Sequence, residues 1–225
     1  MAKQDNETIV DVEKVYSKSE KFYEDNKKSI NIFGTSILAV VLLYLAFVNF
    51  YQQPRELEAS ESMWKAEYYF EIDSLNLAIN GDGNYPGFAQ IATDYSGTKS
   101  ANLANYYMGI SSYRLGDYTS AIAYLKDANL DDDMISSVAL GTIGDAYVEL
   151  EQFQNGVDYF AKAVANSDNE FTAPIYMKKQ AILLENLGEY GKALNIYKSI
   201  KSKYPTSAEG QDMEKYIARA EGLVK

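Results

Sequence analysis

Three short segments recur at nearly constant spacing in the second half of the chain, and this repetition constrains the fold most. They read LGDY at 115–118, LEQF at 150–153 and LGEY at 187–190, and their leucines lie 35 and 37 residues apart. Small and bulky residues recur at fixed offsets around each leucine. The small residues are Gly109, Gly144 and Ala181 before it and Ala121, Gly156 and Ala193 after it, and the bulky ones are Leu125, Phe160 and Tyr197.

Small residues at these offsets let two helices approach closely, while the bulky residues fill the space between neighbouring hairpins. A single hairpin cannot bury its apolar face, so at least three must stack. The pattern resembles the tetratricopeptide repeat (TPR) over about residues 102–207. The resemblance implies an all-α, TPR-type solenoid of helical hairpins, with repeats at 102–135, 137–170 and 174–207.

The second repeat departs from the other two at its turn. Glu151 stands where the others have Gly116 and Gly188. If the turn needs a left-handed residue, this substitution costs about 1 kcal/mol. The 37-residue spacing also predicts a longer loop at about 167–173, after which Pro174 suits the first turn of the next helix and Thr172 is a candidate cap.

Degenerate elements flank the repeats on both sides. Residues 57–80 are predicted as one long helix with Trp64, Tyr68 and Ile72 on one face. The glycine-rich segment 81–87 must end it, and a short helix around Ile91 follows, so 57–98 is interpreted as a degenerate first repeat. After the third repeat, the capping-box pattern at 206–209 predicts a capping helix over 207–224.

An uncharged stretch near the N-terminus runs from Ser29 to Pro54. Within it, residues 32–50 are mostly apolar and would span about 28 Å as a helix, close to the thickness of a bilayer core. A cleaved signal peptide and a buried core helix are the alternatives. The stretch is long, lacks a small-x-small cleavage site and carries no polar stripe, so a transmembrane helix over 31–51 is favoured.

The flanking charges set the expected orientation. Lys18, Lys21, Lys27 and Lys28 precede the apolar stretch, and this bias favours a cytoplasmic N-terminus. We therefore expect a single-pass membrane protein with a cytoplasmic tail at 1–30 and an extracytoplasmic domain at 52–225. In a bacterium this domain would lie in the periplasm, outside the inner membrane. The tail has a weak apolar stripe that begins at Ile9 and is either loosely structured or a partner-binding helix.

Composition excludes several classes of function. The chain has no histidine and no cysteine, so it cannot form a Ser-His-Asp triad, a thiol nucleophile or a His/Cys zinc site by itself. With 32 acidic and 21 basic residues its net charge is -11, which argues against nucleic-acid binding. The acidic run 131–133 precedes a predicted helix and is interpreted as an N-cap, with a divalent-ion site as the alternative. No enzyme activity, cofactor or metal is expected.

A protein-binding surface is what remains. In TPR proteins the first helix of each repeat lines the concave face, and matching by position predicts contacts from seven residues on this face. They are Leu103, Tyr106, Ile110, Tyr113, Val148, Lys178 and Ile182. The alternative is that the 57–80 helix covers this groove. A carboxylate clamp is not expected, because Lys178 is the single basic residue among the matching positions.

The order of parts, a short tail, one anchor and an acidic TPR domain, is similar to the ancillary subunit family of the SecYEG translocon in bacterial inner membranes. This resemblance implies protein partners, namely SecYEG and a membrane-anchored peptidyl-prolyl isomerase chaperone that acts on exported proteins. The alternative is a structural scaffold for another envelope complex, in outer-membrane assembly, division or secretion. The two hypotheses differ in their partners.

Overall fold

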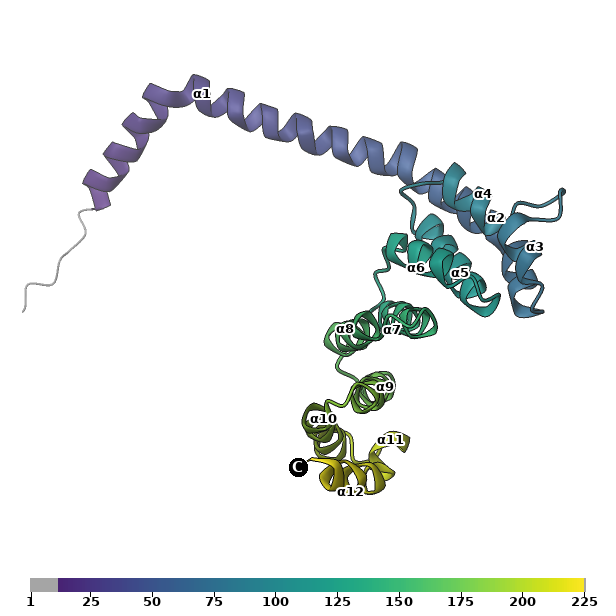
Figure 1. The fold of residues 1–225 in the computed structure, drawn as a ribbon. Helices are drawn as coiled ribbons and strands as arrows, with labels where there is room; N and C mark the ends of the chain where they lie inside the picture. The colour runs from purple at the N-terminus through teal and green to yellow at the C-terminus, as the bar shows by residue number, and fades with distance from the viewer. Residues whose placement is uncertain (1–11, 225) are drawn as a thin grey trace, which may run out of the picture. The chain divides into compact units, whose positions relative to one another are not determined.

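The computed structural model describes residues 12–224, and all regular structure in this range is helical (Figure 1). The predicted all-α class is therefore confirmed. The elements are α1 (Val12–Phe47), the π-helical turn η1 (Val48–Gln52), α2 (Gln53–Glu71), α3 (Leu75–Asn80), α4 (Phe88–Asp94), α5 (Lys99–Arg114), α6 (Tyr118–Asp127), α7 (Asp133–Glu149), α8 (Phe153–Asn166), α9 (Ala173–Asn186), α10 (Tyr190–Lys203), α11 (Ala208–Gln211) and α12 (Met213–Leu223).

The chain divides into two units, Met1–Pro54 and Arg55–Lys225. The described part of the first unit consists of α1, η1 and the start of α2. Because α1 begins at Val12, the predicted tail is helical from that residue onward rather than loosely structured. Ile9, where its apolar stripe begins, lies outside the described residues.

The second unit is a stack of helical hairpins. The pairs α5–α6, α7–α8 and α9–α10 pack as hairpins, and α6 packs on α7 as α8 packs on α9. Figure 1 shows α5, α7 and α9 along one side of this stack and α6, α8 and α10 along the other. We call these sides the A face and the B face. Each hairpin coincides with one repeat, as the sequence period predicts.

Small residues stand where paired helices approach most closely. A Cβ atom on Gly109 would lie 2.4 Å from Cγ of Leu125, and one on Gly144 would lie 2.7 Å from Cδ1 of Phe160. Real Cβ atoms do not tolerate such distances, so helix contact in the first two repeats requires glycine. The predicted role of the small residues is confirmed at these positions.

One turn geometry closes the first helix of each repeat. In the second repeat, the backbone N–H of Gln152 donates to the carbonyl of Tyr147 (2.8 Å) and that of Glu151 to the carbonyl of Val148 (2.9 Å). These paired bonds define a Schellman motif, whose central residue must be left-handed. Glu151 has φ 57°, while Gly116 and Gly188 have φ 82° and 78°. The left-handed conformation expected at Glu151 is confirmed.

The same turn interrupts the helix that was predicted to run unbroken over 57–80, so that prediction was wrong. Asp73 has φ 60°, and the backbone N–H of Ser74 donates to the carbonyl of Tyr69 (2.8 Å). Aspartate tolerates the left-handed region better than most residues. The chain therefore turns at Asp73, and α3 folds back against α5, burying Leu75 and Ala78.

The residues that begin two later helices were only partly predicted. Asp132 accepts a hydrogen bond from the backbone N–H of Ile135 (2.8 Å), which confirms the N-cap interpretation of the acidic run. Thr172 occupies the N-cap of α9 without a side-chain cap bond. Instead, the side-chain carbonyl of Asn169 accepts from the backbone N–H groups of Phe171 and Thr172 (2.8 Å each). Asn169 thus orders the longer loop that the 37-residue spacing predicted.

The C-terminal end of the stack contains two helices where a single capping helix over 207–224 was predicted. The hydroxyl of Ser207, not Thr206, caps α11 by accepting from the backbone N–H of Gly210 (2.9 Å). Gly210 lies so close to Tyr204 that a Cβ would fall 1.9 Å from its carbonyl oxygen, and α11 ends at the next residue. The longer α12 packs on α10 and buries Met213 and Ala220.

Candidate protein-binding groove

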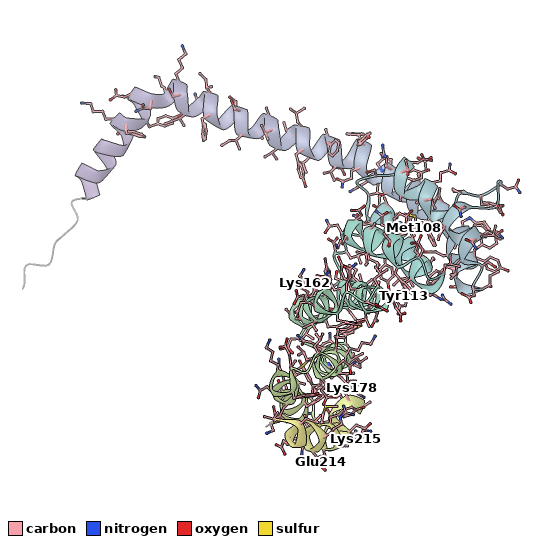
Figure 2. All side chains as sticks on the ribbon, in the orientation of Figure 1. Met108, Tyr113, Lys162, Lys178, Glu214 and Lys215 are labelled. Carbon is pink, nitrogen blue, oxygen red and sulfur yellow. The ribbon has the colours of Figure 1, made fainter. Side chains whose placement is uncertain are left out.

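The seven residues predicted to contact a partner come from the first helix of each repeat. Four lie on α5, Val148 lies on α7, and Lys178 and Ile182 lie on α9. Figure 2 shows Tyr113 and Lys178 on the A face of the stack. All seven side chains are partly buried, so each can pack within the domain and still reach solvent.

A groove of about 190 Å³ opens between α7 and α9 on this face. It brings together the predicted residues Val148 and Ile182, which are joined there by Asp145, Phe160, Lys179, Leu183 and Asn186. The other five predicted residues do not line it. Its walls are largely apolar with one charged pair, which is a composition that suits a peptide side chain and a hydrogen-bonded backbone.

The charged pair in the groove is Asp145 and Lys179. The ammonium of Lys179 lies 2.6 and 2.8 Å from the two carboxylate oxygens of Asp145. Burial, together with the negative charge of Glu149, raises the pKa of Asp145, although Lys179 acts to lower it. The pair therefore holds a carboxylate in a poorly solvated position, where a partner's donor could engage it.

Asp145 was not among the seven predicted contact residues, and sequence reasoning selected Lys178 rather than Lys179. In the structure the ammonium of Lys178 lies 5.2 Å from the ring centroid of Tyr216, away from the groove lining. Asp145 and Lys179 are 34 residues apart, which equals the length of a tetratricopeptide repeat. Opposite charges at the repeat period were therefore the signal that would have identified Lys179.

Tyrosines flank the charged pair. Burial and then the negative charge of Asp145 raise the pKa of Tyr113 to about 12 and that of Tyr176 to about 12. Burial also raises the pKa of Tyr106. All three phenols are neutral at physiological pH, and those of Tyr113 and Tyr176 can offer hydroxyl donors near Asp145.

The predicted residues of the first repeat also serve the domain's own packing. Tyr106, Ile110 and Tyr113 pack against the hydrophobic core shared by the first two repeats. Leu103 packs against a second core, which includes Met63 of α2 and lies within the degenerate repeat 57–98 and α5. Leu103 is therefore partly covered from the N-terminal side, whereas Val148 and Ile182 line an open groove.

A second surface is formed by Trp64 and Tyr68 of α2 and by Ile72, which directly follows this helix; sequence reasoning placed these three residues on one face. About half of each side chain is exposed, at 53%, 46% and 50%. The ring of Tyr85, from the turn before α4, meets Trp64 edge-on at 5.2 Å between centroids. The ammonium of Lys65 lies 4.7 Å from the Tyr68 ring centroid. Large exposed aromatic groups of this kind are typical of protein interfaces.

Among the described residues there is no group of three or more Asp and Glu side chains that could hold a metal ion. In the same range, one helix, Glu20–Glu71, is long and apolar enough to cross a membrane, by length and composition only. Its most apolar window has a mean hydropathy of 2.2 and none of that window is buried.

Comparison with known proteins agrees with the hairpin geometry. Models of the tetratricopeptide repeat match residues 103–128, 138–169 and 179–207. No curated protein matches the chain. The chain is similar in fold to two solved structures. Both are described as a Podosopora anserina putative kinesin light chain with nearly identical TPR-like repeats, and one of them is a point variant. Both have a TM-score of 0.55 and cover 74% of this chain and 86% of their own, at 12% and 13% identity.

The matched segments fall on the hairpins α5–α6, α7–α8 and α9–α10. At such low identity the solved structures bear on the fold alone. The chain therefore contains a solenoid of tetratricopeptide repeats, a fold that generally serves as a non-catalytic scaffold for protein–protein interaction.

Proposed function

We propose that this protein is anchored in a bacterial inner membrane by α1 and holds its repeat domain in the periplasm, where it acts as an ancillary subunit of the Sec translocon. In this role it recruits a membrane-anchored peptidyl-prolyl isomerase chaperone to emerging proteins. The observation that carries the proposal is the open groove on the A face, lined by Val148 and Ile182, in a chain that also contains a long exposed apolar helix.

The apolar part of α1 has the chemistry of a lipid-facing helix. Its polar side chains bond to the helix's own backbone: the hydroxyls of Thr35 and Ser36 donate to the carbonyls of Asn31 and Ile32 (2.7 Å each). A hydrocarbon environment demands such internal satisfaction, because no water is present to accept the bonds. Exposed apolar side chains on this helix include Phe33, Leu38, Val41, Leu43 and Phe47.

The lysine bias before the apolar stretch supports the orientation, since cytoplasmic flanks are enriched in lysine and arginine. The translocon assignment is supported by the order of parts, because a tail, an anchor and an acidic repeat domain follow one another in this chain. An anchor beside the channel would raise the local concentration of the groove at the site where proteins emerge.

Orientation can be tested with single cysteines, because the chain has none of its own. We expect a membrane-impermeant maleimide to label Ser60→Cys in intact spheroplasts and to label Ser17→Cys only after permeabilisation. The opposite pattern would contradict a periplasmic repeat domain. Equal labelling of both before permeabilisation would contradict the transmembrane anchor.

Partner identity can be tested by photo-crosslinking of the full-length protein in its native membrane. A benzoyl-phenylalanine replaces Ile182 in the groove, and the matched control carries it at Asp158, which is exposed on α8. We expect the Ile182 position to capture translocon subunits and a prolyl isomerase, and Asp158 to capture neither. Capture of another envelope complex from Ile182 would favour the alternative role as a scaffold in outer-membrane assembly, division or secretion.

A further inference from the structure

A second cleft, of about 340 Å³, opens among α6, α7 and α8, which places it toward the B face. Figure 2 shows Lys162, one of its lining residues, on the opposite side of the stack from Tyr113. This cleft is therefore separate from the groove on the A face. Its lining includes Lys126, Lys162 and Tyr159 together with the apolar residues Leu125, Ala139 and Ile143.

The charge of this lining differs from that of the whole chain. The chain carries 32 acidic and 21 basic residues, yet the lining includes two lysines and no aspartate or glutamate. The groove on the A face, in contrast, contains the neutralising pair of Asp145 and Lys179. A local excess of positive charge on an acidic protein favours an anionic ligand at this cleft.

Both lysines are held by tyrosine rings. The ammonium of Lys126 donates to the hydroxyl of Tyr147 (2.9 Å) and lies 5.5 Å from the ring centroid of Tyr159. The ammonium of Lys162 lies 4.1 Å from the same centroid. The rings of Tyr147 and Tyr159 pack together at 5.3 Å. Ring contacts orient both ammonium groups beside the cleft without neutralising them.

Neither lysine forms an ion pair with any residue that the structure describes. Other lysines nearby are neutralised, as Lys99 is by Asp131 at 2.7 Å and Lys179 by Asp145. A ligand carboxylate placed between Lys126 and Lys162 would thus meet two available ammonium groups, and charge-assisted hydrogen bonds of this kind are among the strongest in proteins.

The floor of the cleft is apolar. Leu125, Ala139 and Ile143 are buried in it, and Leu130 and Leu140 are partly exposed beside them. A small inorganic anion would leave this floor in contact with water. A ligand with an apolar side chain next to its carboxylate would bury the floor and satisfy the lysines at once.

We propose that this cleft binds an acidic peptide segment, in which an aspartate or glutamate carboxylate lies between Lys126 and Lys162 and a neighbouring aliphatic side chain enters the apolar floor. The interaction is independent of any partner bound on the A face. It gives the repeat domain two protein-binding surfaces of different chemistry, one around the paired Asp145 and Lys179 and one around two lysines without a carboxylate partner among the described residues.

The test measures fluorescence anisotropy with the full-length protein in detergent micelles. The probe is a fluorescein-labelled peptide, Gly-Asp-Leu-Glu-Leu-Gly, and the matched probe replaces Asp by Asn and Glu by Gln. We expect the acidic peptide to bind at least about tenfold more tightly than the amide peptide, with an affinity that falls as salt rises. Equal binding of the two peptides would overturn the proposal.

Two pairs of variants locate the binding. The double variant Lys126→Gln/Lys162→Gln should bind the acidic peptide at least about tenfold more weakly. The double variant Lys126→Arg/Lys162→Arg should bind it as the unchanged protein does. The matched control, Lys192→Gln with Lys198→Gln, removes the same charge from exposed lysines on α10. Circular dichroism establishes that each variant is folded. An equal loss in the control, or no loss in the first pair, would show that the cleft is not the site.

Discussion

The backbone of Gly141 lies directly against the phenol ring of Tyr176. A Cβ atom on Gly141 would come 2.0 Å from Cε1 and 2.2 Å from Cζ of that ring. Gly141 belongs to α7 and Tyr176 to α9, so this contact joins the second repeat to the third. Tyr176 in turn stacks on Phe160, at 6.4 Å between ring centroids.

This contact predicts that Gly141→Ala destabilises the domain. The added methyl group must displace the buried Tyr176 ring, and such overpacking typically costs about 1–3 kcal/mol of unfolding free energy. Gly191→Ala is the matched control, because Gly191 lies in α10 with open space around its Cβ position. Gly191 lies in the first turn of α10, so helix propensity should change the stability of that variant by less than the interior value of about 0.5–1 kcal/mol, and in the stabilising direction. Urea unfolding followed by circular dichroism measures both, and equal changes would contradict the contact.

The left-handed residue Glu151 predicts a stabilising substitution. Glu151→Gly should raise the free energy of unfolding by about 1 kcal/mol, because glycine adopts a positive φ without steric cost. The reverse change, Gly188→Ala in the third repeat, should lower it by about 1 kcal/mol, since open space surrounds this glycine and backbone strain acts alone. Thermal unfolding of both variants is the measurement. A less stable Glu151→Gly protein would show that the side chain contributes more than the strain costs.

Lys179→Met should destabilise the domain in a pH-dependent way. Burial already raises the pKa of Asp145 above its unfolded value, and removal of Lys179 takes away the contact that lowers it. The unpaired carboxylate should cost about 1–2 kcal/mol of unfolding free energy at neutral pH. A carboxyl group whose pKa is raised in the folded state is protonated there at low pH and then carries no charge penalty. The penalty on the folded state develops as pH rises through the folded pKa. The stability lost in Lys179→Met should therefore shrink as pH falls toward about 4.

Urea unfolding at neutral pH and near the unfolded carboxyl pKa checks this expectation. The control is Lys192→Met. Lys192 forms a solvent-accessible ion pair with Glu189, which precedes it by three residues. That variant should change the unfolding free energy by less than about 0.5 kcal/mol at either pH. A loss for Lys179→Met that is independent of pH would exclude Asp145 as its cause.

Arg219→Met should weaken the docking of α12. Arg219 pairs with Glu185 of α9, whose side chain is only 9% exposed. Removing one partner leaves a nearly buried charge uncompensated, and such losses reach about 3 kcal/mol. We expect faster amide exchange over α12, while Lys201→Met, which breaks the exposed pair with Glu214, should leave exchange unchanged. Unaltered exchange in Arg219→Met would contradict a role for this pair in docking.

The repeats could be predicted because helix contact depends on side-chain size at fixed offsets. Gly109 and Gly144 were identified from their spacing alone, and the structure places them against Leu125 and Phe160. The break at Asp73 was not predicted because residues 72–75 lack both the leucine and the aromatic residue that the other three turns share. Residues 72–75 read IDSL and correspond position by position to LGDY at 115–118. Both segments have an aliphatic residue first, then a residue that tolerates a positive φ, then a polar residue and finally a bulky one.

The site was less predictable than the fold. The sequence placed Val148 and Ile182 on one face, but the pairing of Asp145 with Lys179 depends on where α9 lies against α7. Likewise, nothing in the separate segments indicates that Lys126 and Lys162 share the ring of Tyr159. Helix packing decides such contacts, and local patterns carry no information about the rotation of one hairpin on the next.

The sequence by itself determined that the second unit is a stack of helical hairpins, since small and bulky residues recur at the offsets where paired helices meet. It also determined that α1 contains an uncharged stretch of membrane length. Tertiary structure alone decided which charged groups are neutralised. Asp145 and Lys179 meet across a repeat interface, while Lys126 and Lys162 have no carboxylate partner within residues 12–224. Coulomb energy depends on distances that only the packed helices define.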